Sequence, residues 1–161
     1  KSLGDSEEKI AFEKAGIIKK KTPVVLGKMK FPAKQVIVNI AKQKQAPLSE
    51  FGKDFFISRI SVSTDGTIFD YESKNLNLKN LHTNLIGEHQ AFNAGVALTS
   101  FQIYLNKIGK TISEQVLRKA LKEVFWLGRM QILSRKPLVI IDGAHNEEGI
   151  SALANNLQKL F

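Results

Sequence analysis

Apolar positions near the start of the chain recur with the period of a helix. Ile10, Lys14 and Ile17 stand at i, i+4 and i+7, so they share one face. Asp5 and Glu8 have the spacing of an N-cap and the third helical residue, which predicts that the helix starts there. A lysine on this otherwise apolar face either packs its stem on the core with the ammonium group in water, or is partly buried with a lowered pKa.

A strand and then a helix are predicted next. Residues 22–27 form a short apolar run with Pro23 near its start, which is typical of a buried strand. Pro32 is expected to open a helix that runs to about Lys44. A strand followed by a helix indicates an α/β unit. Five apolar residues form the core side of the predicted helix: Ala33, Val36, Ile37, Ile40 and Ala41.

The period changes to two near Phe51. Residues 56–62 alternate between apolar and polar, residues 65–66 are an Asp-Gly turn signal, and residues 67–71 form the returning strand. A further strand is expected within residues 76–86. This part of the chain therefore predicts a small antiparallel meander inserted in an otherwise α/β fold.

Two more helices are predicted after the meander. Gly87 opens a long helix whose apolar stripe recurs every three or four residues. Residues 109–111, Gly-Lys-Thr, resemble the end of a phosphate-binding loop, but Tyr104 occupies the position of its first glycine. Thr111 instead fits a capping box with Glu114, so the next helix is expected to start at Thr111 and run to about Val124.

The last segment predicts a strand, a loop and a helix. Residues 138–141 form a continuous apolar run, as expected for a parallel strand that is buried on both faces. Asn146 follows the loop as an N-cap, and an apolar stripe continues to Leu160. A domain boundary is expected near Val124, which divides the chain into residues 1–124 and residues 125–161.

Composition limits the function classes. The 161 residues suffice for one domain or for parts of two, and the absence of cysteine excludes disulfides and thiolate metal sites. No apolar run approaches the roughly 20 residues of a membrane-spanning helix. The formal net charge of +9 favours anionic partners, but no aromatic residues interleave with the lysines as a nucleic-acid stacking platform requires.

Polar residues at two places have the pattern of a functional site. Asp142 follows an apolar strand and precedes a helix, where open α/β sheets place ligand-binding groups. By spacing alone, Asp142 and Asn146 could equally be turn and cap residues. His89 and Asn93 lie one turn apart on a helix face, which fits either two metal ligands or a buried hydrogen-bonded pair.

Three separated motifs carry a family resemblance. They are residues 3–19, LGDSEEKIAFEKAGIIK; residues 85–94, LIGEHQAFNA; and WLGRMQ at 126–131 followed by DGAHN at 142–146. In this order they resemble the folylpolyglutamate synthases and dihydrofolate synthases, which are Mur-type ATP-dependent ligases. The resemblance implies a central ATPase domain over residues 1–124, with a mostly parallel sheet and a small antiparallel meander. Residues 125–161 are then the start of a Rossmann-like C-terminal domain.

The resemblance also implies a role for individual residues. Lys14 would be carbamylated by CO2 and act in catalysis as a ligand of Mg2+. Asn93 would bind the adenine of ATP and Arg129 its phosphates. Asp142 and His145 would act from the C-terminal domain, Asp142 on ATP and His145 in catalysis. His89 and Gln90 are candidates around the same pocket. Glu147 departs from the family, which usually has proline there.

The implied reaction joins L-glutamate to a folate or to dihydropteroate. ATP phosphorylates a substrate carboxylate, and the amine of glutamate then attacks the acyl phosphate. The resemblance implies a cytoplasmic enzyme that is a monomer at full length, with neither nucleic acid nor a membrane as partner. The family's phosphate-binding loop is expected upstream of Lys1, so the chain alone is expected to be inactive. Alternatives are another Mur-type ligase, making cyanophycin or peptidoglycan precursors, a basic nucleic-acid-binding module, and a structural fragment without activity.

Overall fold

The computed structural model describes residues 6–161, and the predicted cap residue Asp5 lies outside this range. The chain divides into two compact units, which are described separately. The first unit contains residues up to 56 together with 95–110, and the second contains 57–94 together with 111–161.

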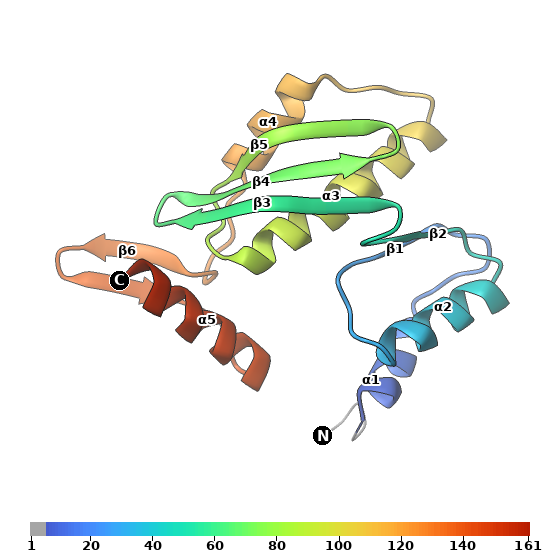
Figure 1. Cartoon of the computed structure of the whole chain (residues 1–161), viewed down its shortest axis with the longest axis horizontal. Coiled ribbons are helices and arrows are strands. Elements are labelled where there is room, and N and C mark those ends of the chain that lie inside the picture. Colours follow the sequence, from blue (N-terminus) through green and yellow to red (C-terminus); the bar gives the residue numbers. More distant parts are fainter. Residues whose placement is uncertain (1–5) are drawn as a thin grey trace. The chain divides into compact units, whose positions relative to one another are not determined.

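The first unit begins with a helix and a parallel strand pair. Its elements in order are α1 (Glu7–Ala15), β1 (Val24–Leu26), α2 (Ala33–Gln43) and β2 (Leu48–Glu50) (Figure 1). β1 and β2 are parallel neighbours, with Val24 opposite Leu48. The predicted α/β unit is therefore confirmed. Strand β2 was not predicted, because its three residues Leu-Ser-Glu carry no apolar run.

Helix α1 packs on the core through a different face from the one predicted. Ala11, Ala15 and Ile18 are buried, whereas Ile17 is 80% exposed and Lys14 is also exposed. The alanines at i and i+4 have small side chains, which fit close against the neighbouring helix α2. Of the two alternatives for Lys14, partial burial on an apolar face is therefore wrong, because the residue is exposed.

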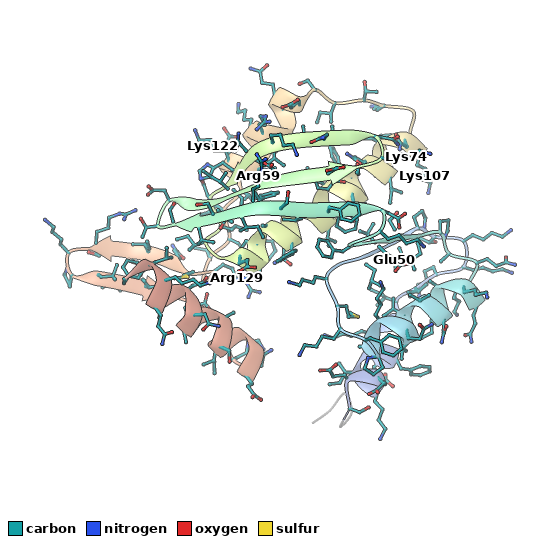
Figure 2. The ribbon with its side chains drawn as sticks, in the orientation of Figure 1. Glu50, Arg59, Lys74, Lys107, Lys122 and Arg129 are labelled. Atoms are coloured by element: carbon teal, nitrogen blue, oxygen red, sulfur yellow. The ribbon has the colours of Figure 1, made fainter. Side chains whose placement is uncertain are left out.

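A buried carboxylate closes the end of β2. Glu50 (Figure 2) is only 9% exposed. Its carboxylate lies 2.8 Å from the Lys34 ammonium and 3.5 Å from that of Lys53. The hydrogen bond from Lys34 lowers the pKa of Glu50, and the charge of Lys53 adds to this, while burial opposes it. The pair fastens α2 to the carboxyl end of β2.

The second unit is built on the predicted meander. Strands β3 (Phe55–Ser63), β4 (Gly66–Ser73) and β5 (Leu76–Thr83) are hydrogen-bonded in the order β3-β4-β5, and β4 and β5 are antiparallel (Figure 1). The inward side chains of β4 and β5 are almost inaccessible to solvent: Phe69, Tyr71, Leu78 and Leu81. The meander prediction is confirmed.

A buried aspartate sits where the register of β4 and β5 shifts. Asp70 is 2% exposed, and its Oδ1 accepts a 2.8 Å hydrogen bond from the backbone N–H of Asn80. Its Oδ2 lies 3.6 Å from the Lys79 ammonium and 3.7 Å from Nε of Arg59. The hydrogen bond from Asn80 lowers the pKa of Asp70, and the charges of Lys79 and Arg59 add to this, while burial opposes it.

We expect Asp70 to make the free energy of unfolding fall in acid. Because its folded pKa is depressed, its stabilisation is present above the unfolded pKa of about 3.9 and is lost as pH falls through the folded value. Urea unfolding between pH 7 and pH 2 should show this loss in the parent and a shallower acid slope in Asp70→Asn. Asp65→Asn changes an exposed carboxylate and serves as control. An unchanged acid slope in Asp70→Asn would contradict the assignment.

Two helices, α3 and α4, follow the three meander strands along the chain. Helix α3 (Glu88–Lys107) contributes its first residues to the second unit, and α4 (Glu114–Glu123) contacts β5. The N-cap of α4 is Ser113, whose Oγ accepts from the N–H of Val116 at 3.4 Å. The predicted cap, Thr111, is therefore wrong by two positions, because Ser113 is the residue that reaches an unpaired N–H of the first turn.

A hairpin and a helix complete the second unit. Strands β6 (Gln131–Arg135) and β7 (Leu138–Ile141) pair antiparallel and lead into α5 (Glu147–Leu160) (Figure 1). The prediction of a parallel β7 buried on both faces is wrong for the described residues. The two-residue connection places β7 next to β6, and Leu138, Val139 and Ile141 remain 41–46% exposed. Among the described residues, no helix is long and apolar enough to cross a membrane.

Candidate functional site

The loop between β7 and α5 presents the N-terminus of a helix. Asn146 is the N-cap as predicted, and its Oδ1 accepts from the N–H of Gly149 at 2.8 Å. Nδ1 of His145 lies 2.9 Å from the carbonyl oxygen of Gly143, which accepts a hydrogen bond when Nδ1 is protonated. The unpaired N–H groups of such a helix end favour an anion.

Asp142 fastens this loop to the loop that precedes β6. Its Oδ2 accepts from the N–H of Met130 and its Oδ1 from the N–H of Ala144, both at 2.7 Å. The N–H of Gly143 donates to the carbonyl of Gly128 at 2.7 Å. The alternative interpretation of Asp142 as a turn residue is therefore partly correct, because its carboxylate joins the two loops through these hydrogen bonds.

Arg129 lies between two residues with left-handed backbone. Gly128 has φ +67° and Met130 has φ +47°, and Met130 is 3% exposed. Gln131 accepts from the N–H of Gly128 at 3.2 Å through its side-chain oxygen. The buried Met130 side chain and the Asp142 hydrogen bond anchor this turn, which carries the exposed Arg129 (Figure 2).

The start of α3 is held by a buried threonine on β4. Thr67 is fully buried, and its Oγ1 donates to the carbonyl of Leu85 at 2.8 Å and accepts from the N–H of Gly87 at 3.0 Å. Gly87 has φ +123°, which favours glycine. A Cβ at Gly87 would lie 2.7 Å from the ring of His89 and 2.8 Å from Nδ2 of Asn156.

Three side chains on α3 form a hydrogen-bonded chain. Nδ2 of Asn93 donates to Oε1 of Gln90 at 3.2 Å, and Nε2 of Gln90 lies 3.0 Å from Nε2 of His89. With this amide orientation, Nε2 of His89 accepts and its ring proton is on Nδ1. Desolvation lowers the pKa of His89 and the Arg129 charge adds to this, while the Asp142 charge opposes it.

A cavity of about 300 Å³ joins these elements within the second unit. Of the predicted residues, His89, Gln90, Arg129 and Asp142 line it. Asn93 and His145 are exposed and are absent from its lining, and Lys14 belongs to the first unit. Three polar or sulfur-containing side chains in the lining were not predicted as pocket residues: Met130, Asn146 and Asn156.

The cavity combines few charges with several neutral polar groups. Arg129 supplies the positive charge, and the first turn of α5 adds the partial positive charge of a helix N-terminus. Both oxygens of Asp142 already accept backbone N–H groups. Gln90 and Asn156 are residues that are each more than nine-tenths buried. Such a site can bind an anionic group at one place and read a neutral polar group at another.

Gly87 provides the sharpest structural test of the site. We expect Gly87→Ala to lower the free energy of unfolding by about 1–3 kcal/mol, because the backbone is strained and the Cβ collides with His89 and Asn156. Gly109→Ala is the matched control, since Gly109 also has a positive φ, +64°, but nothing lies near its Cβ. Chemical denaturation measures both losses. Equal losses in the two variants would show that the predicted collision is absent.

Comparisons with known proteins agree with this architecture. No family model matches the chain. A dihydrofolate synthase/folylpolyglutamate synthase of Bacillus subtilis is 35% identical over 99% of the chain and 37% of its own length. A folylpolyglutamate synthase of Lacticaseibacillus casei is 32% identical over 100% of the chain and 38% of its own length. A solved folylpolyglutamate synthase complex with AMPPCP and folate superimposes with a TM-score of 0.94 at 31% identity, covering 99% of the chain and 39% of its own.

These similarities identify first a broad class of enzymes and then a family within it. The mixed α/β fold, with its parallel and antiparallel strands, is that of a Mur-type ligase. More narrowly, the chain belongs to the folylpolyglutamate synthase and dihydrofolate synthase family. It spans less than two fifths of the length of the curated relatives named above.

Proposed function

We propose that this chain forms part of an enzyme that joins L-glutamate to a folate or to dihydropteroate at the expense of ATP. The observation that carries the proposal is the cavity, which brings Arg129 and Asp142 together beside the N-terminus of α5. The family membership supports it, as does the solved relative that holds AMPPCP and folate. The proposal includes the domain boundary near Val124, a monomer at full length and a cytoplasmic location.

The nucleotide would use both sides of the cavity. The guanidinium of Arg129 suits phosphate oxygens because its N–H groups form a planar fork. The N-terminus of α5 favours the same negative charge. Asn93 would hydrogen-bond the adenine, and His145 would act at the C-terminal side of the nucleotide. His89 and Gln90 would complete the wall through the hydrogen-bonded chain that links them to Asn93.

The proposed reaction has two steps. A carboxylate oxygen of the folate attacks the γ-phosphorus of ATP, the bond to the bridging oxygen breaks, and ADP leaves. The amine of L-glutamate then attacks the carbonyl carbon of the acyl phosphate, loses a proton, and expels inorganic phosphate to leave an amide. Arg129 would stabilise the phosphoryl group during the first step, because fixed positive charge acts most strongly where negative charge develops.

Lys14 is proposed to carry a carbamate. Its ammonium group would first lose a proton. The neutral amine would then attack CO2, form an N–C bond and release a second proton, so that a cation becomes an anion. The described residues contain no group of three His, Cys, Asp or Glu side chains that could hold a metal ion. They therefore do not form a magnesium site by themselves, and the carbamate would supply one oxygen ligand of the kind that Mg2+ prefers.

Substrate-dependent ADP release tests the proposal. The chain, extended to its relatives' full length, should release ADP only when ATP, L-glutamate and a pteridine acid are all present. Dihydropteroate and tetrahydrofolate, supplied separately, distinguish the two synthase activities. Release with a peptidoglycan precursor or a cyanophycin primer instead would indicate another Mur-type ligase. Salt-dependent duplex DNA binding without any ADP release would favour the basic nucleic-acid-binding module.

A further inference from the structure

Asn156 is a buried amide that faces the cavity. It is 7% exposed, lies on α5 and lines the cavity with Gln90. The two amides differ in their bonding. Gln90 uses both ends of its amide, toward His89 and Asn93, whereas no hydrogen bond joins the Asn156 side chain to another described residue. Because no described residue pairs with this amide, its donor and its acceptor remain available to a ligand in the cavity.

The cavity runs along one face of α5 from a charged end to a neutral end. Five residues of the loop and helix line it: Asn146, Gly149, Ala152, Leu153 and Asn156. Their spacing places them on one face, and the ten positions from Asn146 to Asn156 span about 15 Å. Arg129 and the helix N-terminus mark the charged end, whereas Asn156 lies against Gly87, close to the ring of His89.

We propose that Asn156 is a specificity-determining residue that reads the base of the nucleotide. Its Nδ2 donates to N7 of adenine and its Oδ1 accepts from the 6-amino group, which is the bidentate pattern that asparagine forms with adenine. A 6-oxo purine presents two acceptors at the same edge and meets Oδ1 without a proton. This inference rests on the proposed function, to which it adds Asn156 as a second amide that contacts the base.

Gly87 and the small residues of α5 make this reading possible. The absence of a Cβ at Gly87 lets Asn156 approach the start of α3. Gly149 and Ala152 leave the helix face open between the two ends of the cavity, and Leu153 offers an apolar surface to a planar ring. The base then lies between α5 and the first turn of α3, with its phosphates directed toward Arg129.

The test compares ATP with ITP, which differ at the 6-position of the purine. In the chain extended to its relatives' full length, Asn156→Leu should lower the preference for ATP over ITP in kcat/KM roughly tenfold or more. Its Tm should stay near that of the parent, because leucine has a similar size and no hydrogen bond to another described residue is lost. Asn155→Leu changes the exposed neighbour of Asn156 and should leave the preference unchanged. Asn156→Ala provides the same comparison with a smaller side chain if leucine prevents folding.

The outcomes separate this inference from the proposed function. An unchanged ATP preference in both Asn156 variants, with ATP affinity weakened by Arg129→Ala, would overturn the role of Asn156 and leave the nucleotide site standing. Unchanged ATP affinity in the Asn156 and Arg129 variants would remove the nucleotide from this cavity and overturn both. A lost preference in the Asn156 variants alone, with Asn155→Leu unaffected, would support the inference.

Discussion

Lys14→Ala is expected to abolish glutamate-dependent ADP release in the chain extended to its relatives' full length. The carbamate would be a direct ligand of Mg2+, and even partners one shell further from a metal typically contribute about 10–100-fold. We therefore expect kcat to fall by about 100-fold or more. The exposed position of Lys14 is compatible with access of CO2. Steady-state kinetics measure the effect, and short-chain carboxylates should partly restore activity by supplying the missing oxygen ligand.

Lys19→Ala is the matched control for this substitution. Lys19 is also exposed and lies one residue after the buried Ile18, outside α1. It should retain normal kinetics. Full activity in Lys14→Ala, or activity that is insensitive to removal of CO2 from the buffer in the parent, would contradict the carbamate.

Arg129→Ala and Asp142→Ala are expected to have the next largest effects. Loss of a charge-assisted hydrogen bond from Arg129 to phosphate costs about 1.5–3 kcal/mol, which corresponds to roughly 10- to 150-fold in kcat/KM for ATP. Asp142→Ala should be more severe, because it also leaves the N–H groups of Met130 and Ala144 without acceptors. Nucleotide titration and steady-state kinetics measure the first effect, and Tm measures the second.

Arg135→Ala separates these effects from a general loss of positive charge. Arg135 lies on β6 and contacts Thr64 and Asp65 at 3.2 and 3.1 Å, outside the cavity. Its ATP kinetics should stay near those of the parent. Normal kinetics in both Arg129→Ala and Asp142→Ala would leave the cavity without its main support as a nucleotide site.

The sequence predicts the type of element better than the face on which it packs. Helix α1 offers two sets at the same spacing, Ile10, Lys14 and Ile17 against Ala11, Ala15 and Ile18. The first is more apolar at its ends, yet the second is buried, because small alanines permit close contact with α2. Periodicity cannot choose between two such faces, since the partner helix decides.

The local sequence pattern also could not predict how strand β7 pairs. The apolar run 138–141 suits a parallel or an antiparallel strand, and the short connection to β6 produces the antiparallel pair. The N-cap of α4 is Ser113 rather than the predicted Thr111. The sequence could not distinguish them, because both hydroxyl residues suit the start of a helix.

The candidate site likewise contains residues that motifs predict and one residue that only the fold reveals. His89, Gln90, Arg129 and Asp142 were predicted from motifs, and the fold brings them to one cavity. Asn156 could not be found from the sequence, because an asparagine beside Asn155 on a helix has the pattern of a solvent-exposed residue. Only the close approach of α5 to Gly87 reveals that one of the two is buried.

Transfer of oxygen from the substrate carboxylate to phosphate tests the central claim most directly. A folate substrate labelled with oxygen-18 in the carboxylate to be extended would be incubated with ATP, L-glutamate and the chain extended to its relatives' full length. Formation and breakdown of an acyl phosphate predicts one labelled oxygen in each inorganic phosphate released, and one added glutamyl residue per ATP consumed. Unlabelled phosphate, or ATP consumption without glutamyl addition, would contradict the assignment of this chain to a folate–glutamate ligase.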